Sequence, residues 1–192
     1  MKKIGITGSI GSGKTYVSKV FESLGIPVFN ADNEAKKNMS CSFDLINSIK
    51  NEFGDDIYDK YTLNKRKLAS IVFSDSKKLK KLNSLVHPFV RHEFLNWCKK
   101  QKSPYVIKEA AILFESNSDK ELDSVICITA PKNLRIDRVK ARDGFKDYEI
   151  NNRMKNQFSQ EEKENLSDYI VVNDEKELLL PQIISIHEKL IN

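Results

Sequence analysis

The chain has 192 residues, of which 40% are hydrophobic and 31% are charged, and its formal net charge is +5. This length and ordinary globular composition predict one domain, or one core with inserted lobes, and the scattered lysines suit a small anionic ligand without giving a nucleic-acid-binding signature. No stretch approaches the ~18 apolar residues of a membrane span, and the three cysteines are too widely spaced for a zinc site or a disulfide framework, so we expect a cytoplasmic protein with neither a nucleic-acid nor a membrane partner.

The first predicted element is a short apolar strand over residues 4–7, followed at once by Gly-Ser-Ile-Gly-Ser-Gly-Lys-Thr at residues 8–15. This sequence fits the pattern G-x-x-x-x-G-K-[ST] of a phosphate-binding loop. Its glycines let successive backbone N–H groups form a nest for anions, and the helix that follows adds its positive end. We expect Lys14 to reach the β- and γ-phosphates of ATP and the Thr15 hydroxyl to bind Mg²⁺. The other loop residues assigned to ATP are Gly8, Gly11, Ser12, Gly13 and Tyr16.

A second strand is predicted over residues 26–29, after a helix over residues 15–24 that Gly25 ends. Asp32 comes just beyond the carboxyl end of this strand, where open α/β sheets bind ligands. Asp32 is therefore our candidate general base, which accepts the proton of an attacking hydroxyl. A helix N-cap is an alternative role, and one residue can fill both.

Residues 33–102 contain little strand signal, so we expect a mostly helical insertion that binds the second substrate. Within it, Ser74 suits an N-cap and Pro88 suits a first helical position. The helices are predicted at residues 43–53, 65–73, 75–85 and 88–100.

Three side chains outside the loop are assigned to the acceptor together with Asp32, namely His87, Arg91 and Glu109. A packed or capping histidine is the alternative for His87. Glu109 ends the third predicted strand and is also assigned to Mg²⁺ through water, the alternative being a surface carboxylate paired with Lys108. The lysines at 77–81 either contact the acceptor's phosphates or face solvent, and solvent is the usual environment of a charge run on a helix.

Three more strands are predicted, at residues 105–107, 124–129 and 169–172, and helices separate them. Five apolar strands alternating with helices imply a parallel sheet covered on both faces. With the phosphate loop after the first strand, the fold class is α/β: a P-loop three-layer α/β/α sandwich. We also expect a capping box at residues 159–162 and a closing helix over 175–190, which Pro181 dents or begins.

The helix expected over residues 131–143 carries Arg135, Arg138 and Arg142 on one face. Phosphoryl transfer spreads negative charge over the transferred group, and arginines of a closing lid stabilise that charge. Gly144 then breaks the helix, so we expect a lid over about residues 132–158, with Arg138 and Arg142 as catalytic groups. A solvated basic face is the alternative.

The pattern of motifs favours a small-molecule kinase over other P-loop proteins. An Asn-Lys-x-Asp strand end and an Asp-x-x-Gly switch, typical of guanine-specific proteins, do not occur in the sequence. A nucleoside or nucleoside-monophosphate kinase remains an alternative, although residues 33–104 hold only Arg66 and Arg91 to bind an acceptor phosphate. A nucleotide-binding module without turnover is a second alternative.

Taken in order along nearly the whole chain, several segments resemble the dephospho-CoA kinase family. They are the loop at 5–15, Phe21-x-x-Leu24-Gly25, Ala31-Asp32, the His-Pro segment at 87–91, Ile112–Glu115, Arg138-x-x-x-Arg142-Asp143, Arg153-Met154-x-x-Gln157 and residues 168–173. The resemblance implies transfer of the ATP γ-phosphate to the ribose 3′-hydroxyl of 3′-dephospho-CoA, the last step of coenzyme A biosynthesis. It places Asn173 where the adenine is approached.

The resemblance also implies a core, a helical substrate lobe and a lid, and we expect the core at 1–32, 103–131 and 159–192 and the lobe at 33–102. We expect a monomer or weak homo-oligomer. The chain departs from the family pattern in two places. Asn30-Ala31-Asp32 replaces Asp-Ala-Asp, which keeps the assigned base. Glu109 replaces an aspartate with a carboxylate one methylene longer, and Ala111 replaces a proline, so we expect a differently shaped turn under the acceptor.

Overall fold

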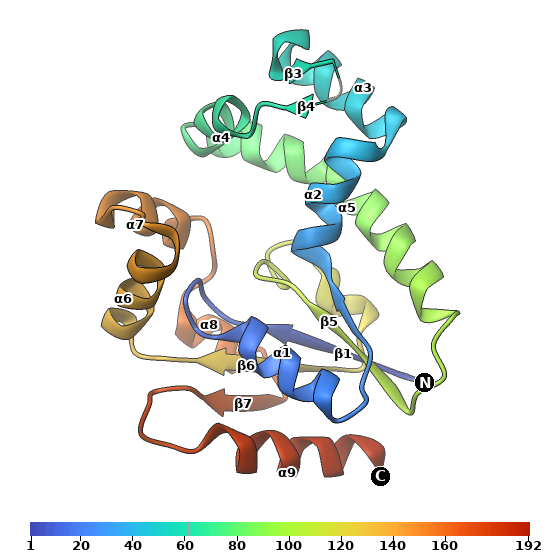
Figure 1. The fold of residues 1–192 in the computed structure, drawn as a ribbon, viewed down its shortest axis with the longest axis vertical. Coiled ribbons are helices and arrows are strands. Elements are labelled where there is room, and N and C mark those ends of the chain that lie inside the picture. The colour runs from blue at the N-terminus through green and yellow to red at the C-terminus, as the bar shows by residue number, and fades with distance from the viewer. Residues whose placement is uncertain (61) are drawn as a thin grey trace. The chain divides into compact units, whose positions relative to one another are not determined.

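The computed structural model describes residues 1–60 and 62–192 (Figure 1). Contacts within the chain divide it into two compact units. One unit joins Met1–Asn30 to Lys100–Asn192, and the other is Ala31–Lys99. In the described residues, none of the helices combines the length and the apolar character that crossing a membrane requires.

A five-stranded parallel sheet forms the centre of the first unit, as predicted. Its order is β2-β5-β1-β6-β7, so the strand that leads into the phosphate loop is central. The strands are β1 (Lys2–Thr7), β2 (Val28–Asn30), β5 (Tyr105–Glu109), β6 (Ser124–Thr129) and β7 (Tyr169–Val172). Because β1, β5 and β6 are buried almost throughout, they are apolar runs without the alternation of half-exposed strands.

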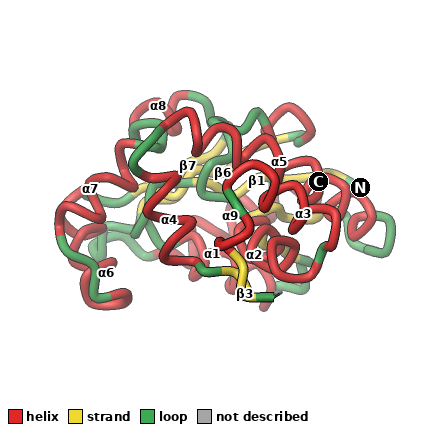
Figure 2. The backbone as a smooth tube through the Cα atoms, turned by 90° about the horizontal axis from the view of Figure 1, so that it is seen from above, coloured by secondary structure: helices red, strands yellow, loops and turns green. Residues whose placement is uncertain are grey.

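Helices cover both faces of this sheet, which completes three layers (Figure 2). On one face lie α1 (Lys14–Ser23) and α9 (Leu179–Ile191), whose apolar side chains pack on the isoleucines of β1, β5 and β6. On the other lies α8 (Gln160–Asn165). The segment after β5, which includes the 3₁₀ turn η2 (Ser118–Glu121), also packs on β1. A methyl group on Gly5 would meet Leu113 and Leu122, so β1 approaches this second layer closely.

Two further helices stand between β6 and α8, namely α6 (Lys132–Asp143) and α7 (Asp147–Lys155). Gly144 ends α6 in the left-handed conformation, as the sequence predicted. The predicted capping box is confirmed, because the Ser159 side chain accepts from Glu162 N–H while the Glu162 carboxylate accepts from Ser159 N–H. Pro181 lies in the first turn of α9, so it marks the true start of that helix and does not dent it.

The second unit is mostly helical and differs from prediction in four ways. The helix α2 and a short antiparallel hairpin, β3 with β4, were not expected, and Asp75 rather than Ser74 caps the last helix. The Asp75 carboxylate accepts from the backbone N–H of Lys77, whereas Ser74 closes the preceding helix. The elements are α2 (Ala31–Cys41), α3 (Phe43–Phe53), η1 (Asp55–Ile57), β3 (Tyr58–Asp59), β4 (Thr62–Leu63), α4 (Lys65–Phe73) and α5 (Ser76–Cys98).

The fourth difference is that α5 is one helix with Pro88 inside it, where two helices were predicted. An interior proline costs about 3 kcal/mol because it removes a backbone hydrogen bond. Five residues spaced four apart bury one continuous stripe on both sides of it, and this packing outweighs the cost: Leu82, Val86, Val90, Phe94 and Cys98. Pro88 itself is exposed, so its ring does not interrupt the stripe.

Candidate active site

The loop between β1 and α1 needs glycine at two positions for reasons of space as well as conformation. Gly11 and Gly13 have φ of 80° and 98°, which side chains other than glycine rarely adopt. A Cβ on Gly11 would lie 2.4 Å from the backbone oxygen of Arg135, and one on Gly13 would lie 2.1 Å from Nδ2 of Asn173. The loop is thus packed tightly against α6 and against the residue after β7.

Lys14 folds back over the loop that precedes it. Its ammonium donates to the backbone oxygens of Gly8 (2.9 Å) and Ser9 (3.3 Å). The helix α1 that Lys14 begins has no acidic side chain in its first turn and no side-chain cap at Gly13. The positive dipole end of α1 therefore meets no acidic side chain of its own first turn, as a phosphate site requires.

Thr15 and Asn30 both contact the carboxylate of Glu109. The Thr15 hydroxyl donates to Oε1 (3.0 Å), and the Asn30 amide donates to Oε2 (2.9 Å). The parallel pairing of β2 with β5 sets Asn30 opposite Glu109, and Glu109 is only 5% exposed. Glu109 is consequently a buried group at the mouth of the loop, and the interpretation as a surface carboxylate is wrong.

Asn173, predicted near the adenine, lies against the loop from the other side. Its Nδ2 donates to the Ser12 backbone oxygen (2.8 Å), and its own N–H is held by Thr129 (2.8 Å). Arg138 donates to the backbone and side-chain oxygens of Asn173 and pairs with Glu175 at 2.9 Å. Arg138 therefore joins the end of β7 to α6 beside the loop.

The three arginines of α6 lie in three different environments. Arg135 is buried and its Nε donates to the Ala130 backbone oxygen (3.0 Å), so burial lowers the pKa of its guanidinium. A solvated basic face is therefore wrong for Arg135. Arg142 is exposed and forms two hydrogen bonds with its neighbour Asp143, which raise its pKa. The lid role assigned to Arg138 and Arg142 stays a prediction.

The remaining assigned residues belong to the second unit. Asp32 is the second residue of α2 and lies in its first turn, where a carboxylate interacts favourably with the helix dipole. His87 and Arg91 are four residues apart on α5 and therefore share a face of that helix. His87 is partly buried and Arg91 is exposed. The roles of these three residues stay predictions.

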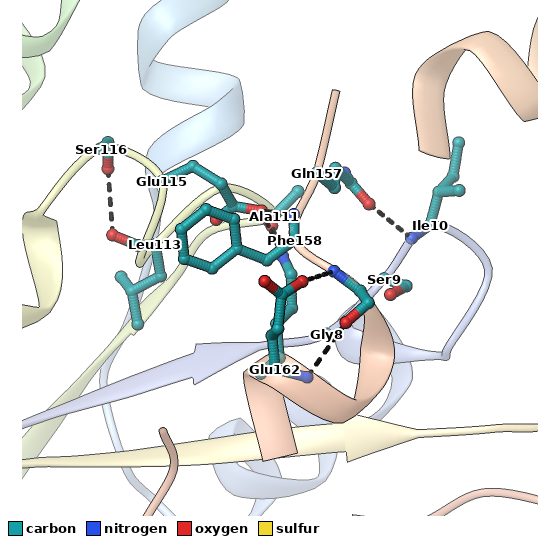
Figure 3. A network of polar contacts seen from close by, with 12 residues as sticks. Gly8, Ser9, Ile10, Ala111, Leu113, Glu115, Ser116, Gln157, Phe158 and Glu162 are labelled. Carbon is teal, nitrogen blue, oxygen red and sulfur yellow. Dashed lines mark hydrogen bonds and ion pairs between the residues drawn. The ribbon is translucent and has the colours of Figure 1, made fainter. Parts of the chain in front are cut away.

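A network of polar contacts that was not predicted reaches the loop from the chain after α7 (Figure 3). The Gln157 amide oxygen accepts from Ile10 N–H (3.1 Å), and Phe158 N–H donates to Glu115 (2.7 Å). Glu115 in turn pairs with Lys163 at 2.9 Å. The sequence carried one signal for it, since Gln157 and Glu115 both fall in the segments that resemble a family.

Comparison with known proteins identifies similar chains. The family model described as dephospho-CoA kinase matches residues 2–178. A dephospho-CoA kinase of Porphyromonas gingivalis is 36% identical over 192 residues, covering 98% of this chain and 94% of the relative. One of Bacteroides fragilis is 35% identical over 185 residues, covering 96% and 90%.

Solved structures agree with the fold. The crystal structure of TT1252 from Thermus thermophilus superposes with a TM-score of 0.85 at 30% identity, over 99% of this chain and 96% of that one. A dephospho-CoA kinase from Campylobacter jejuni gives a TM-score of 0.67 at 24% identity, over 98% and 96%. A shikimate kinase from Acinetobacter baumannii gives 0.55 at 15% identity, over 100% and 93%, which shows the shared fold alone.

Proposed function

We propose a mechanism on the premise that this chain belongs to the dephospho-CoA kinase family, because the family model matches residues 2–178. Members of the family transfer the γ-phosphate of ATP to the ribose 3′-hydroxyl of 3′-dephospho-CoA, which gives coenzyme A. The curated relatives carry this name, and neither the nucleoside-monophosphate kinase nor the non-catalytic alternative is favoured. We infer that the steps of this reaction fall to the phosphate loop, to Asp32 and to the arginines of α6.

The ATP site rests on the loop of residues 8–15, and the position of Lys14 is the observation that carries it. The Lys14 ammonium is held above the loop by the backbone oxygens of Gly8 and Ser9, so a triphosphate in the nest would meet a positioned positive charge. The backbone N–H groups of the loop and the N-terminus of α1 would hold the remaining phosphate oxygens. Asn173 would lie beside the adenine of the bound ATP.

Mg²⁺ fits the donor atoms beside the loop. The Thr15 hydroxyl and the Glu109 carboxylate lie 3.0 Å apart and supply the hard oxygen ligands that Mg²⁺ prefers. In residues 1–60 and 62–192, His, Cys, Asp and Glu side chains do not form groups of three or more that could hold a metal by themselves. That suits an ion that takes its other ligands from phosphates and water. When bound, Mg²⁺ neutralises charge on the β- and γ-phosphates.

Asp32 is the proposed general base. The 3′-hydroxyl attacks the γ-phosphorus, its proton passes to the Asp32 carboxylate, and ADP leaves as the bond from the β–γ bridging oxygen to the γ-phosphorus breaks. The order of residues supports this role, because Asp32 comes two residues after Asn30, whose amide donates to Glu109 beside the phosphate loop. Asp32 lies in the first turn of α2, where a carboxylate interacts favourably with the helix dipole.

The helices α6 and α7 are proposed as the lid and residues 33–102 as the acceptor lobe. Arg138 has one buried nitrogen, Nη1, that makes no hydrogen bond to a described residue, which leaves a donor for a ligand. Arg138 and Arg142 would stabilise the charge of the transferred group. His87 and Arg91, on one face of α5, would bind the acceptor.

The test is ADP release from Mg²⁺-ATP with 3′-dephospho-CoA, run beside AMP, CMP, GMP and adenosine. Turnover is expected with dephospho-CoA alone. Asp32→Asn should lower kcat by ~10²-fold or more and change ATP affinity only a few-fold. Near-normal turnover of that variant would remove Asp32 as the base, and turnover with a monophosphate instead would overturn the acceptor.

A further inference from the structure

The chain that leaves α7 is attached to two different parts of the core within two residues. The side chain of Gln157 accepts a hydrogen bond from Ile10 N–H in the phosphate loop (3.1 Å), and the backbone N–H of Phe158 donates to Oε1 of Glu115 (2.7 Å) (Figure 3). Ser159 then caps α8. The C-terminal end of the proposed lid is therefore fixed to the loop and to the segment after β5 at the same time.

The Glu115 end of this attachment is rigid because it is an ion pair away from water. The Lys163 side chain is 0% exposed and the Glu115 side chain 13% exposed, with 2.9 Å between Nζ and Oε1. Lys163 also donates to the Ala111 backbone oxygen (2.6 Å). A buried pair adds little net stability compared with apolar residues, but breaking it leaves an uncompensated charge. The pair therefore holds one geometry, and Phe158 N–H is part of it.

Between the ends of α6 and α7, Arg138 ties α6 to Asn173 and Glu175. Two other ion pairs of these helices, Lys140 with Asp147 and Arg142 with Asp143, involve exposed residues, and such surface pairs contribute little. At the start of α6 the buried Arg135 provides the opposite anchor through the Ala130 oxygen. The two helices are thus fixed at both ends and at Arg138.

We propose that Gln157 is a positioning residue for phosphoryl transfer, which holds the phosphate loop through the Ile10 amide and couples it to the fixed end of α7. This inference rests on the proposed function of the loop and lid. Ile10 lies in the loop of residues 8–15, and because its N–H donates to Gln157, that bond orders the loop without itself being part of the anion nest. Gln157 supplies a neutral acceptor, so it orders the loop without placing negative charge beside the triphosphate.

The first measurement is hydrogen exchange of the Ile10 amide by NMR in the protein without ligands. Gln157→Ala removes the acceptor and is expected to speed exchange at Ile10 by about tenfold, leaving the amides of β6 and β7 unchanged. Asn156→Ala is the matched control, because Asn156 bonds only within its own helix, to the Asn152 oxygen (3.0 Å), as far as the described contacts go. Unchanged exchange at Ile10 in Gln157→Ala would overturn the proposal.

The second measurement is kinetic. Gln157→Ala should raise KM for ATP by about three- to tenfold, the effect of one neutral hydrogen bond, with KM for dephospho-CoA unchanged. Gln157→Glu keeps a hydrogen-bond acceptor on a side chain of equal length, so exchange at Ile10 should stay slow. Its negative charge should weaken ATP binding, and this weakening should be smaller at high salt than at low salt. A Gln157→Glu variant that exchanges as fast as Gln157→Ala would contradict the hydrogen-bond role.

The two measurements separate this inference from the proposed function. Exchange at Ile10 is recorded without substrate, so it reports the anchor whether or not dephospho-CoA is the acceptor. Faster exchange in Gln157→Ala together with no turnover of dephospho-CoA by the unmodified protein would support the anchor and overturn the function. Normal turnover of dephospho-CoA by the unmodified protein, together with unchanged Ile10 exchange in Gln157→Ala, would support the function and overturn the anchor.

Discussion

Substituting Gly13 by alanine tests how firmly Asn173 holds the phosphate loop. Gly13 has φ of 98°, and a methyl group there would lie 2.1 Å from Nδ2 of Asn173. The left-handed conformation costs an alanine roughly 1–2 kcal/mol. Moving Asn173 away breaks its buried hydrogen bond to the Ser12 oxygen, which costs about 1–3 kcal/mol more. We therefore expect Gly13→Ala to lower the free energy of unfolding by about 2–5 kcal/mol.

Gly25 provides a control in which an alanine adds backbone strain but no steric clash. Its φ is 82°, similar to that of Gly13, but no atom lies within 4 Å of the position its Cβ would take. Gly25→Ala should cost only the roughly 1–2 kcal/mol of conformational strain. Both variants are compared by urea unfolding, followed by circular dichroism at 222 nm. Equal losses of stability would refute the argument, because they would mean that Asn173 adjusts without cost.

Three further predictions concern the same chain. Asn30→Asp replaces the amide that donates to Glu109 at 2.9 Å by a second carboxylate. Two charged carboxylates at that distance repel each other, so the stability loss measured in urea titrations should be small at pH 4 and grow to about 1–3 kcal/mol at pH 7. A loss that shrinks as pH rises would contradict this expectation. Pro88→Ala restores a backbone donor at an exposed position of α5 and should raise the free energy of unfolding by about 1–2 kcal/mol. A lower urea midpoint for this variant would contradict the argument that α5 forms in spite of the cost of Pro88. Burial raises the pKa of the Cys127 thiol to about 11, so a disulfide reagent at pH 8 should label the exposed Cys41 first and Cys127 only on unfolding; equally fast labelling of both would show that Cys127 is reachable.

The sequence predicted best those elements whose local pattern and tertiary environment agree. The strand over 124–129 and the helices over 43–53 and 65–73 have the predicted bounds. The hairpin β3–β4 was missed because two-residue strands leave no periodicity to detect. At Pro88 packing outweighs the preference of proline for the first position of a helix, because the buried stripe of α5 extends over both predicted helices.

The site shows the same division between local and distant information. Lys14, Thr15 and the glycines follow from a motif of eight consecutive residues. The contact of Asn30 with Glu109 depends on the register of β2 against β5, 79 positions apart in the chain. The bonds from Asn173 to Ser12 and from Ile10 to Gln157 span 161 and 147 positions. A single sequence carries no physical signal for pairings of that kind, so the partners of the loop were out of reach even where the residues themselves had been singled out.

The sheet order explains why so many separate segments meet at one loop. Because β1 is central, with β5 on one side and β6 then β7 on the other, the chain that leaves each neighbouring strand emerges at the same edge as the loop. Glu109 ends β5, Arg135 follows β6 and Asn173 follows β7, and each touches a different loop residue. The loop is thus held from several directions by protein contacts alone. Its N–H groups do not have to be ordered by the nucleotide, which lowers the entropic cost of binding. The amides of Ile10 and Ser12, which donate to Gln157 and to the Ser9 backbone oxygen, should accordingly exchange slowly even without ATP, and Gln157 supplies the part of that protection that a single side chain can remove.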